Sequence, residues 1–555
     1  MSLPLFIEKD VDHDPVAFPK LTAAEVAAAR RIGRVERYGP GQYLFEARQQ
    51  GANFFVLVDG AIEVIDTSGD EERLVVEHRA NGFIGDLNIF ANRPASVTCR
   101  VSAPSEVIRL TNDNLRHLLA CEASLGERLI EAFLRRRELL EESGFEGMRV
   151  FGDRKCPETQ RIREFLHRNG VAYRWVDTGD PASGAVLASL DGGPYRFPLV
   201  AWSHKVLEER PSISDLADHV GVRCRIPDEI FDTVIIGSGP SGLGAAVYAA
   251  SEGLHTLVLD RLGPGGQAGS SSRIENYAGF PAGLSGRELA LRSYIQALKF
   301  GATFSSPCDV TEIRCLDGEL HAIETDDGTV VRTKTVIIST GVTYRNLDVR
   351  GLRAFRDIGV YYSATQVEAM LCSDRPVHVI GAGNSAGQAA MYLSKFTKDV
   401  RLIVRGTDLQ KSMSQYLADR VAVNPRIDIR LSTELRAIEG DRKLERITLE
   451  DTAKQKTYQE ESCGIFIFIG ATPCTDFLGD HFLRDDKGFL MTGMDVVAAG
   501  KWAPTDRSPC PLETSCAGVF AAGDCRSRTT KRVAFAVGDG ALAVTCVHDF
   551  LGTYR

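Results

Sequence analysis

Residues 231–260 read FDTVIIGSGPSGLGAAVYAASEGLHTLVLD, and this stretch decides the fold of the largest part of the chain. An apolar run leads into Gly237, Gly239 and Gly242 in G-x-G-x-x-G spacing, and Asp260 ends the next apolar run. The glycines allow a tight strand-to-helix turn and let the backbone approach a pyrophosphate at the helix N-terminus, while Asp260 can accept a hydrogen bond from a ribose hydroxyl. A glycine-rich packing turn is the alternative, but strand, helix and acid in register favour a dinucleotide-binding fold.

A second copy of this pattern occupies residues 375–406, RPVHVIGAGNSAGQAAMYLSKFTKDVRLIVRG. Gly381, Gly383 and Ala386 keep the spacing, and Ala386 is small enough for close helix–strand contact. Arg405 stands where an acid would bind the ribose of NAD, and Lys411 follows. Such cations suit the extra phosphate of NADP, although both could be solvated surface charges. Two nucleotide folds in one chain predict a relay of hydride from nicotinamide to flavin.

The C-terminal stretch 518–544, GVFAAGDCRSRTTKRVAFAVGDGALAV, supports FAD in the first of these folds. Its AAGD turn brings Asp524 toward a ribityl or phosphate group. The helix that we expect to begin near Val533 directs its N-terminal amides at the flavin ring, and its dipole would stabilise negative charge on reduced flavin.

Residues 229–550 resemble the low-molecular-weight thioredoxin reductase family. The matching motifs include GGQ (265–267), IENYAGFP (274–281), STG (339–341) and FIFIGATP (466–473). The resemblance implies a homodimer with two interleaved Rossmann-like α/β domains, FAD-binding at 229–343 plus 477–555 and NAD(P)-binding at 344–476. It implies FAD contacts at Gly237, Gly239, Pro240, Ser241, Gly242, Asp260, Gly266, Gln267, Asn276, Thr340, Gly341, Gly523, Asp524, Val533 and Ala534, and NAD(P) contacts at Gly381, Gly383, Asn384, Ser385, Ala386, Arg405 and Lys411.

The sequence departs from this family at the redox-active dithiol. The family's C-A-T-C falls on Ser363–Gln366, and neither Ser nor Gln can exchange a disulfide. The family's H-R-R falls on 404–406, Val-Arg-Gly, which weakens the NADP preference. Cys372 and Cys525 are candidate substitutes, but each stands alone in the sequence and is expected to be inert core filler.

The segment 149–226 resembles a glutaredoxin- or thioredoxin-like domain. Cys156 begins a helix in KCPETQ, where the helix dipole and Lys155 favour a thiolate, and it is the candidate catalytic residue. Thr159 replaces the second cysteine, so the module is monothiol at best. Pro198 in RFPLV is expected to be cis. A redox role and a degenerate spacer are equally open.

Residues 1–148 resemble a cyclic-nucleotide-binding domain, a β-roll plus helices. The family's Gly-Glu pair appears as Gly85-Asp86, which could bind a ribose hydroxyl. Its phosphate-binding arginine falls on Ala95, and Arg93 is a possible replacement. A small ligand is therefore one reading of this domain, and a degenerate docking or dimerisation module is the other.

Composition limits the remaining possibilities. The chain has 555 residues, 44% hydrophobic and 25% charged, as in ordinary globular protein, and a net charge of −9 argues against nucleic acid. The start, MSLPLFIEKDVDHDP, predicts no signal peptide, and no membrane span or metal site is predicted. Thirteen scattered cysteines favour reduced thiols in a cytoplasm.

Together these features predict a multidomain, FAD-dependent NAD(P)H oxidoreductase without the family's dithiol. Its acceptor is open: oxygen, a quinone, a ferredoxin-like protein, a partner's disulfide or Cys156 in cis. Two other functions stay possible. One is a flavoprotein sensor that responds through its cyclic-nucleotide-binding-like domain, and the other is a thioredoxin reductase with a relocated dithiol.

Overall fold

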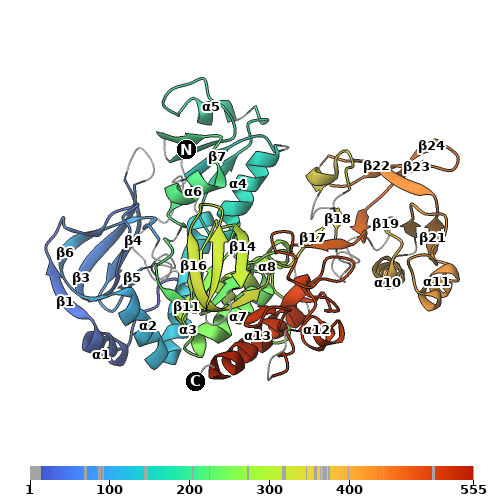
Figure 1. Cartoon of the computed structure of the whole chain (residues 1–555). Helices are drawn as coiled ribbons and strands as arrows, with labels where there is room; N and C mark the ends of the chain where they lie inside the picture. The colour runs from blue at the N-terminus through green and yellow to red at the C-terminus, as the bar shows by residue number, and fades with distance from the viewer. Residues whose placement is uncertain are drawn as a thin grey trace.

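A computed structural model describes the chain in four sheet-based parts and a connecting ribbon (Figure 1). The last of these parts, drawn mainly in orange, lies apart from the other three and joins them through a narrow connection. The structure describes residues 14–553 except 68–71, 86–88, 90–92, 143–147, 155, 182, 203–204, 224, 272–273, 275, 316–319, 346, 356–358, 363, 365–371, 373–374, 398, 442 and 503–506.

The N-terminal part is a six-stranded antiparallel β-roll with three helices, as predicted. The long strands β3 and β6 are rich in apolar residues and are buried over most of their length. Phe133 on α3 packs against Phe54 and Phe83 of the roll and closes its core. The elements are α1 (Ala23–Ile32), β1 (Arg34–Tyr38), β2 (Tyr43–Phe45), β3 (Phe54–Asp66), β4 (Arg73–Arg79), β5 (Phe83–Ile84), β6 (Thr98–Leu110), α2 (Asn112–Cys121) and α3 (Ala123–Glu142).

The second part is a small α/β unit whose sheet has the order β10-β9-β7-β8. β7 and β8 are parallel and joined by α4, whereas β9 and β10 run antiparallel to their neighbours. The Phe197–Pro198 peptide is cis, as expected. The elements are β7 (Met148–Phe151), α4 (Pro157–Arg168), β8 (Arg174–Val176), α5 (Ser183–Leu187), β9 (Leu199–Trp202), β10 (Lys205–Glu209) and α6 (Ile213–Val220).

The third part contains the first glycine-rich turn in a seven-stranded sheet of order β13-β12-β11-β16-β15-β14. β27, almost two hundred residues further along the chain, pairs in parallel with β16, so two distant segments complete one domain. The elements are β11 (Ile230–Ile236), α7 (Pro240–Ser251), β12 (Thr256–Leu259), η2 (Ala268–Ser270), α8 (Gly286–Lys299), β13 (Thr303–Ser305), β14 (Val310–Cys315), β15 (His321–Thr325), β16 (Val330–Ile338), α12 (Met494–Ala498), β27 (Val519–Ala521), η4 (Gly523–Cys525) and α13 (Val533–Thr553).

The fourth part is inserted between those two segments. The chain enters through β17 (Val342–Tyr344) and returns through β26 (Ala471–Pro473), which pair with each other. Between them lie the parallel sheet β18-β25-β19-β20-β21 and a three-stranded antiparallel sheet. The elements are η3 (Leu352–Phe355), β18 (Val360–Tyr361), β19 (Val377–Ile380), α10 (Asn384–Leu393), β20 (Val400–Ile403), α11 (Gln415–Ala422), β21 (Ile427–Arg430), β22 (Thr433–Glu439), β23 (Arg446–Asp451), β24 (Lys456–Glu461) and β25 (Gly464–Ile467).

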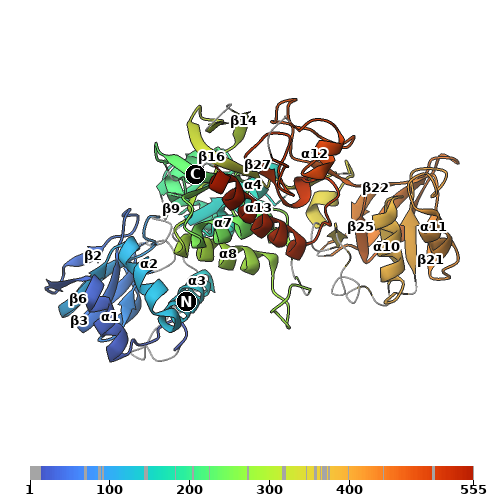
Figure 2. The same ribbon diagram turned by 60° about the horizontal axis from the view of Figure 1, so that its bottom comes forward.

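Helix α13 is the one helix in the described residues that is long and apolar enough to cross a membrane, over Val533–Gly552. It lies against α7, which in turn contacts α8 (Figure 2). The contact is close, because a Cβ at Gly540 would lie 2.2 Å from the Ser241 carbonyl oxygen. The helix therefore packs as part of the domain core.

One prediction about the cysteines is wrong. Cys315, at the end of β14, and Cys516, in the loop before β27, form a disulfide rather than two free thiols. The sequence could not show this pairing, because 201 residues separate the two positions and the folded sheet brings them together.

Candidate active site

Glycines build a turn between β11 and α7 that leaves no room for side chains. Gly237 has φ of +98°, and a Cβ there would lie 2.5 Å from the Ser339 carbonyl oxygen. A Cβ at Gly242 would lie 1.9 Å from the Gly237 oxygen, and one at Gly266 would lie 2.8 Å from the Cα of Gly239. This cradle at the N-terminus of α7 fits the pyrophosphate of FAD, because backbone N–H groups can approach the anion directly.

Asp260 supports this turn more directly than the sequence suggested. One carboxylate oxygen accepts hydrogen bonds from the Ser238 amide and hydroxyl, both at 2.7 Å. The other accepts from the amides of Leu262 and Gly263, at 2.8 and 2.7 Å. These four bonds use all of the roughly four acceptor sites of a carboxylate. A ribose hydroxyl would have to displace one of them, so the ribose-binding role of Asp260 stays a prediction.

The C-terminal segment closes the same cradle. A Cβ at Gly523 would lie 2.8 Å from the Ser241 side chain, and the buried Ser241 hydroxyl has no hydrogen-bond partner in the structure. Burial, with the nearby Asp539 carboxylate, raises the pKa of Asp524 to about 6 against the opposing Lys531. An unpartnered hydroxyl and a desolvated carboxyl group fit a polar cofactor chain. Helix α13 begins at Val533, as predicted, and Ala534 is exposed on its first turn.

The remaining predicted FAD contacts lie at several separate positions. Gln267 donates to the Val342 carbonyl at 3.4 Å, and Thr340 donates to that of Cys474 at 2.7 Å. These two residues and Gly341 therefore lie where the chain crosses into the NAD(P)-binding part. Asn276 is exposed. Pro240 is the first residue of α7.

Cys525 lies in the core of the FAD-binding part, and its expected inertness stays a prediction. It is fully buried, and its thiol donates to the carbonyls of Ile338 and Ala522, both at 3.4 Å. Burial raises the pKa of this thiol to about 11.

The second glycine turn is built like the first. A Cβ at Gly381 would lie 2.3 Å from the Phe468 carbonyl oxygen, and Gly383 caps α10. Ala386 is buried, whereas Asn384 and Ser385 are exposed on the first turn of the helix. This pattern fits a nucleotide pyrophosphate at the N-terminus of α10.

Two cations stand beside this turn. The Asn384 side chain accepts a hydrogen bond at 2.8 Å from the Ser414 amide, which fixes the loop after β20 near α10. Arg405 and Lys411 on this loop are exposed, and among the described residues neither has a carboxylate within 4.0 Å. Both are therefore available to an anionic ligand.

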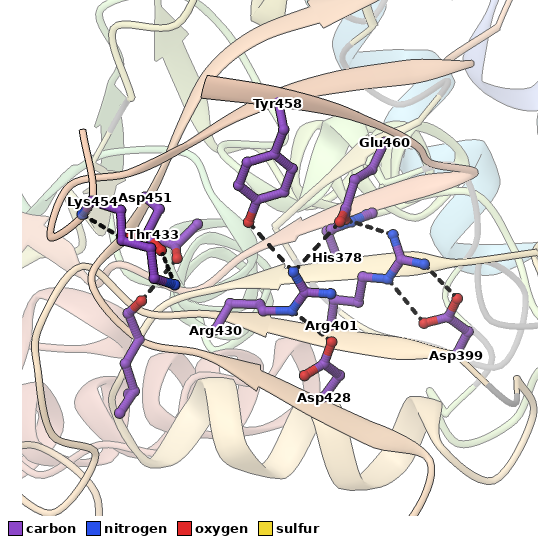
Figure 3. Close-up of polar contacts among 11 residues, drawn as sticks. His378, Asp399, Arg401, Asp428, Arg430, Thr433, Asp451, Lys454, Tyr458 and Glu460 are labelled. Carbon is purple, nitrogen blue, oxygen red and sulfur yellow. Dashed lines mark hydrogen bonds and ion pairs between the residues drawn. The ribbon is translucent and has the colours of Figure 1, made fainter. Parts of the chain in front are cut away.

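A buried polar network lies on the far side of the same sheet (Figure 3). His378 on β19 contacts Ser462 at 3.0 Å and Glu460 at 3.2 Å. The spacing resembles a Ser-His-acid triad, but Ser462 and His378 are both fully buried, so no substrate reaches them. The hydrogen bonds from His378 and Arg401, with the nearby positive charge of Arg430, lower the pKa of Glu460 to about 2 although burial opposes the shift. The network therefore holds β24 against the parallel sheet.

Ser363 and Gln366 lie outside the described residues, but their neighbourhood is visible. Tyr361 packs on Phe466 inside the domain, with ring centroids 5.2 Å apart. Tyr362 stacks on Tyr344 instead, at the connection between the two domains.

The expectation that Cys372 stands alone is also wrong. Its buried thiol is in hydrogen-bonding contact with Cys463, which immediately precedes β25. The two residues are distant in sequence, so no local pattern could reveal the pair.

Cys156 is the N-cap of α4, as predicted, but its thiol donates to the Glu158 carboxylate at 3.0 Å. A thiolate would face that negative charge, and sequence reasoning overlooked Glu158 although it is two residues away. Thr159 is fully buried in the position of a second cysteine. Lys155 lies outside the described residues.

The other end of α4 contacts the FAD-binding part. Asn169 donates to the Leu262 carbonyl at 2.7 Å and accepts from the Ser306 hydroxyl at 3.3 Å. A helix rises 1.5 Å per residue, so Cys156 lies roughly 20 Å from this contact. The candidate thiol is at the end of the helix that points away from Asp260 and its turn.

The N-terminal part encloses a cavity of about 380 Å³ together with the small α/β unit. Its walls are mainly apolar, and Trp202 and Val220 of the α/β unit close it. Ala95, at the position of the family's phosphate-binding arginine, lies in the wall. Asp86 lies outside the described residues.

Arg93 also lines this cavity, but its guanidinium hydrogen-bonds to the neighbouring parts of the chain and is not available to bind a phosphate. Its guanidinium donates to the Asn169 carbonyl and, at 3.1 Å, to the Tyr294 hydroxyl on α8. The cavity is thus connected through Arg93 and Asn169 to the Leu262 loop that hydrogen-bonds Asp260.

Comparison with known proteins agrees with this geometry. Residues 231–540 match the pyridine nucleotide-disulphide oxidoreductase family, and residues 35–121 match the cyclic nucleotide-binding domain. A thioredoxin reductase from Treponema pallidum (strain Nichols) is 32% identical over 325 residues, covering 59% of this chain and 98% of the relative.

Two solved structures show the same similarity. The thioredoxin reductase from Streptococcus pyogenes MGAS5005 is 31% identical with a TM-score of 0.50, and that from Giardia duodenalis is 25% identical with a TM-score of 0.51. Each match covers 59% of this chain and 100% of the solved chain. The chain therefore belongs to the pyridine nucleotide-disulphide oxidoreductase family and is an FAD-dependent NAD(P)H oxidoreductase of the thioredoxin reductase type.

Proposed function

We propose that this enzyme takes electrons from NAD(P)H onto FAD and passes them to an acceptor that is not a dithiol at positions 363 and 366. The observation that carries the proposal is the sequence itself, in which Ser363 and Gln366 occupy the positions of the family's two cysteines. FAD, when bound, accepts hydride from the nicotinamide and can release electrons to many acceptors. The protein's part is to hold the two nucleotides at the glycine turns.

A stopped-flow experiment can identify the electron acceptor. The purified holoenzyme is reduced anaerobically with NADPH or NADH in a stopped-flow instrument. It is then mixed with oxygen, a quinone, ferredoxin or oxidised thioredoxin, and flavin reoxidation is followed. We expect reoxidation by one of the first three and none above background by thioredoxin. Rapid reoxidation by thioredoxin would overturn the proposal in favour of a relocated dithiol.

We infer further that the small α/β unit is a thioredoxin- or glutaredoxin-like module. Its strand order and the helix capped by Cys156 support this assignment. Transfer from the flavin to Cys156 in cis is the less favoured route, because the thiol lies at the distant end of α4. The test oxidises Cys156 with glutathione disulfide and then reduces the flavin with NADPH. A new thiol in wild type that is absent in Cys156→Ser would revive the route in cis.

A second function, response to a ligand, is favoured by the cavity and by Arg93. A molecule in the cavity would contact the module boundary that reaches the Asp260 loop. The probes are cAMP and cGMP. If either binds, we expect it to change the rate of flavin reduction in wild type but not in Arg93→Ala, with Arg79→Ala, an exposed surface change, as the matched control. Binding without any effect on the flavin would contradict the sensor function.

Dimerisation and location are proposals of the same kind. The family resemblance supports a homodimer, and the scattered cysteines of the sequence favour a cytoplasmic location. Light scattering on the purified holoenzyme tests the first, and cell fractionation tests the second.

A further inference from the structure

Cys372 and Cys463 are brought together at one edge of the NAD(P)-binding sheet. Cys463 directly precedes β25, and its amide donates to the Pro376 carbonyl at 2.9 Å, just before β19. A Cβ on the next residue, Gly464, would lie 3.3 Å from the Cys372 sulfur. The two thiols are in hydrogen-bonding contact, with Cys372 buried and Cys463 half-buried.

The two thiols have unequal environments. The hydrogen bond from Cys372, together with the charges of Arg375 and Lys443, lowers the pKa of Cys463 to about 6, although burial opposes the shift. The contact with Cys463 and burial raise the pKa of Cys372. Cys463 is therefore the nucleophile at neutral pH, and Cys372 is the protonated partner behind it.

A second thiol pair in the same chain shows that contact alone does not produce this asymmetry. Cys510 and Cys546 also interact through their side chains. Burial raises the pKa of both, that of Cys546 to about 12, so neither is a thiolate at neutral pH.

We propose that Cys372 and Cys463 form a reversible dithiol–disulfide site that reduces a disulfide-bonded substrate. Cys463 forms a bond to one substrate sulfur, the substrate S–S bond breaks, and the released thiolate takes up a proton. Cys372 then loses its proton, and its sulfur bonds to the Cys463 sulfur and displaces the substrate sulfur attached there, which leaves as a thiolate and takes up that proton. The site is oxidised by two electrons to a Cys372–Cys463 disulfide, and the substrate is reduced to two thiols.

This site is separate from the nucleotide turn. β19 and β25 are parallel, and both begin at the edge that carries the thiols. The Gly381 turn follows the other end of β19, roughly 13 Å away at 3.3 Å per residue. A substrate can therefore reach Cys463 while NAD(P)H is bound, and the site does not depend on the electron route proposed above.

Glutathione disulfide is the probe, applied to the full-length holoenzyme without NAD(P)H. Free thiols are then alkylated, and the peptides are mapped by mass spectrometry without reduction. Wild type should give a Cys372–Cys463 cross-linked peptide. Cys372→Ala should keep glutathione on Cys463, because the resolving thiol is gone, and Cys463→Ala should leave Cys372 unmodified. Cys372→Ser replaces the first variant if the alanine does not fold.

Cys510 and Cys546 serve as the internal control and should carry no glutathione and form no disulfide, so both are recovered as free thiols when the protein is denatured before alkylation. The pH dependence of alkylation gives an independent readout. The midpoint for Cys463 should lie near pH 6 in wild type and move toward about 8.5 in Cys372→Ala. Full alkylation of Cys372 and Cys463 after glutathione disulfide treatment would overturn the proposal. So would glutathione on Cys510 as readily as on Cys463.

Discussion

Tyr344 and Tyr362 stack on each other, with ring centroids 5.5 Å apart and 22° between the ring planes. Tyr344 ends β17, the strand by which the chain enters the NAD(P)-binding domain, and Tyr362 directly precedes Ser363. The stack therefore ties the segment that carries the dithiol in thioredoxin reductases to the connection between the two domains. Aromatic pairs of this kind contribute about 1 kcal/mol beyond their buried area.

Tyr362→Ala should loosen this connection. Arg345, the residue after Tyr344, is exposed and offers a trypsin site. Loss of about 1 kcal/mol of local stability should increase cleavage after Arg345 about fivefold, because local opening becomes more frequent. Limited proteolysis with mass spectrometry measures the rate. Tyr362→Phe keeps the stack and should be cleaved at the wild-type rate. Equal cleavage rates for Tyr362→Ala and Tyr362→Phe would show that the stack does not stabilise the connection.

Gly237→Ala should abolish FAD binding. The substitution puts a side chain at a φ of +98° and within 2.5 Å of the Ser339 oxygen, so the cradle must distort. Gly253→Ala is the matched control, because Gly253 has φ of +85° but nothing within 4 Å of the added Cβ. We expect the control to lose about 1 kcal/mol of stability and keep its flavin. Equal FAD absorbance in the two purified variants would contradict this assignment of the turn.

Much of this site could be predicted from the sequence because it is local. The turns at Gly237 and Gly381 and the helix start at Val533 each depend on a few consecutive residues, and the structure confirms their geometry. Their ligands are specified by backbone shape, which a glycine pattern encodes.

The rest depends on contacts between distant segments. Nothing near Arg93 in sequence indicates that it joins Asn169 and Tyr294, and nothing near Cys372 indicates Cys463. The four hydrogen bonds that the Asp260 carboxylate accepts depend on the conformation of the loops around it, which the sequence does not specify. The contact between Glu158 and Cys156 is different, because the two residues are close in sequence and their interaction is local.

Asp524 should make the flavin-free protein less stable as pH rises. Its ordinary pKa of 3.8 is raised to about 6 in the folded state, so folding favours the protonated form. The stabilisation is complete below pH 3.8 and is lost as pH increases through 6. Asp524→Asn should therefore raise the Tm of the flavin-free protein at pH 7.5, by a few degrees for a gain of about 1–2 kcal/mol after allowance for partial exposure. At pH 4 the two proteins should melt alike, and a difference that does not depend on pH would contradict this origin.

Arg405 and Lys411 should distinguish NADPH from NADH. If they bind the extra phosphate, Arg405→Ala and Lys411→Ala should each raise the KM for NADPH about tenfold, the loss of one exposed charge-assisted hydrogen bond. The KM for NADH should not change. Lys456→Ala, an exposed cation on β24, controls for the overall charge of the domain. Equal increases in the KM for NADPH and for NADH would mean that these cations do not bind the extra phosphate of NADPH.

Glu158→Gln should make Cys156 more reactive. The Cys156 thiol donates to the Glu158 carboxylate at 3.0 Å, so a thiolate at this helix start has an anion as its nearest polar neighbour. Removing the negative charge beside the sulfur should therefore speed alkylation by iodoacetamide at pH 7.5 about fivefold. Glu164→Gln, on the same helix but paired with Arg168, is the control and should leave the rate unchanged. If Glu158→Gln alkylates no faster than this control, the carboxylate does not restrain the thiol.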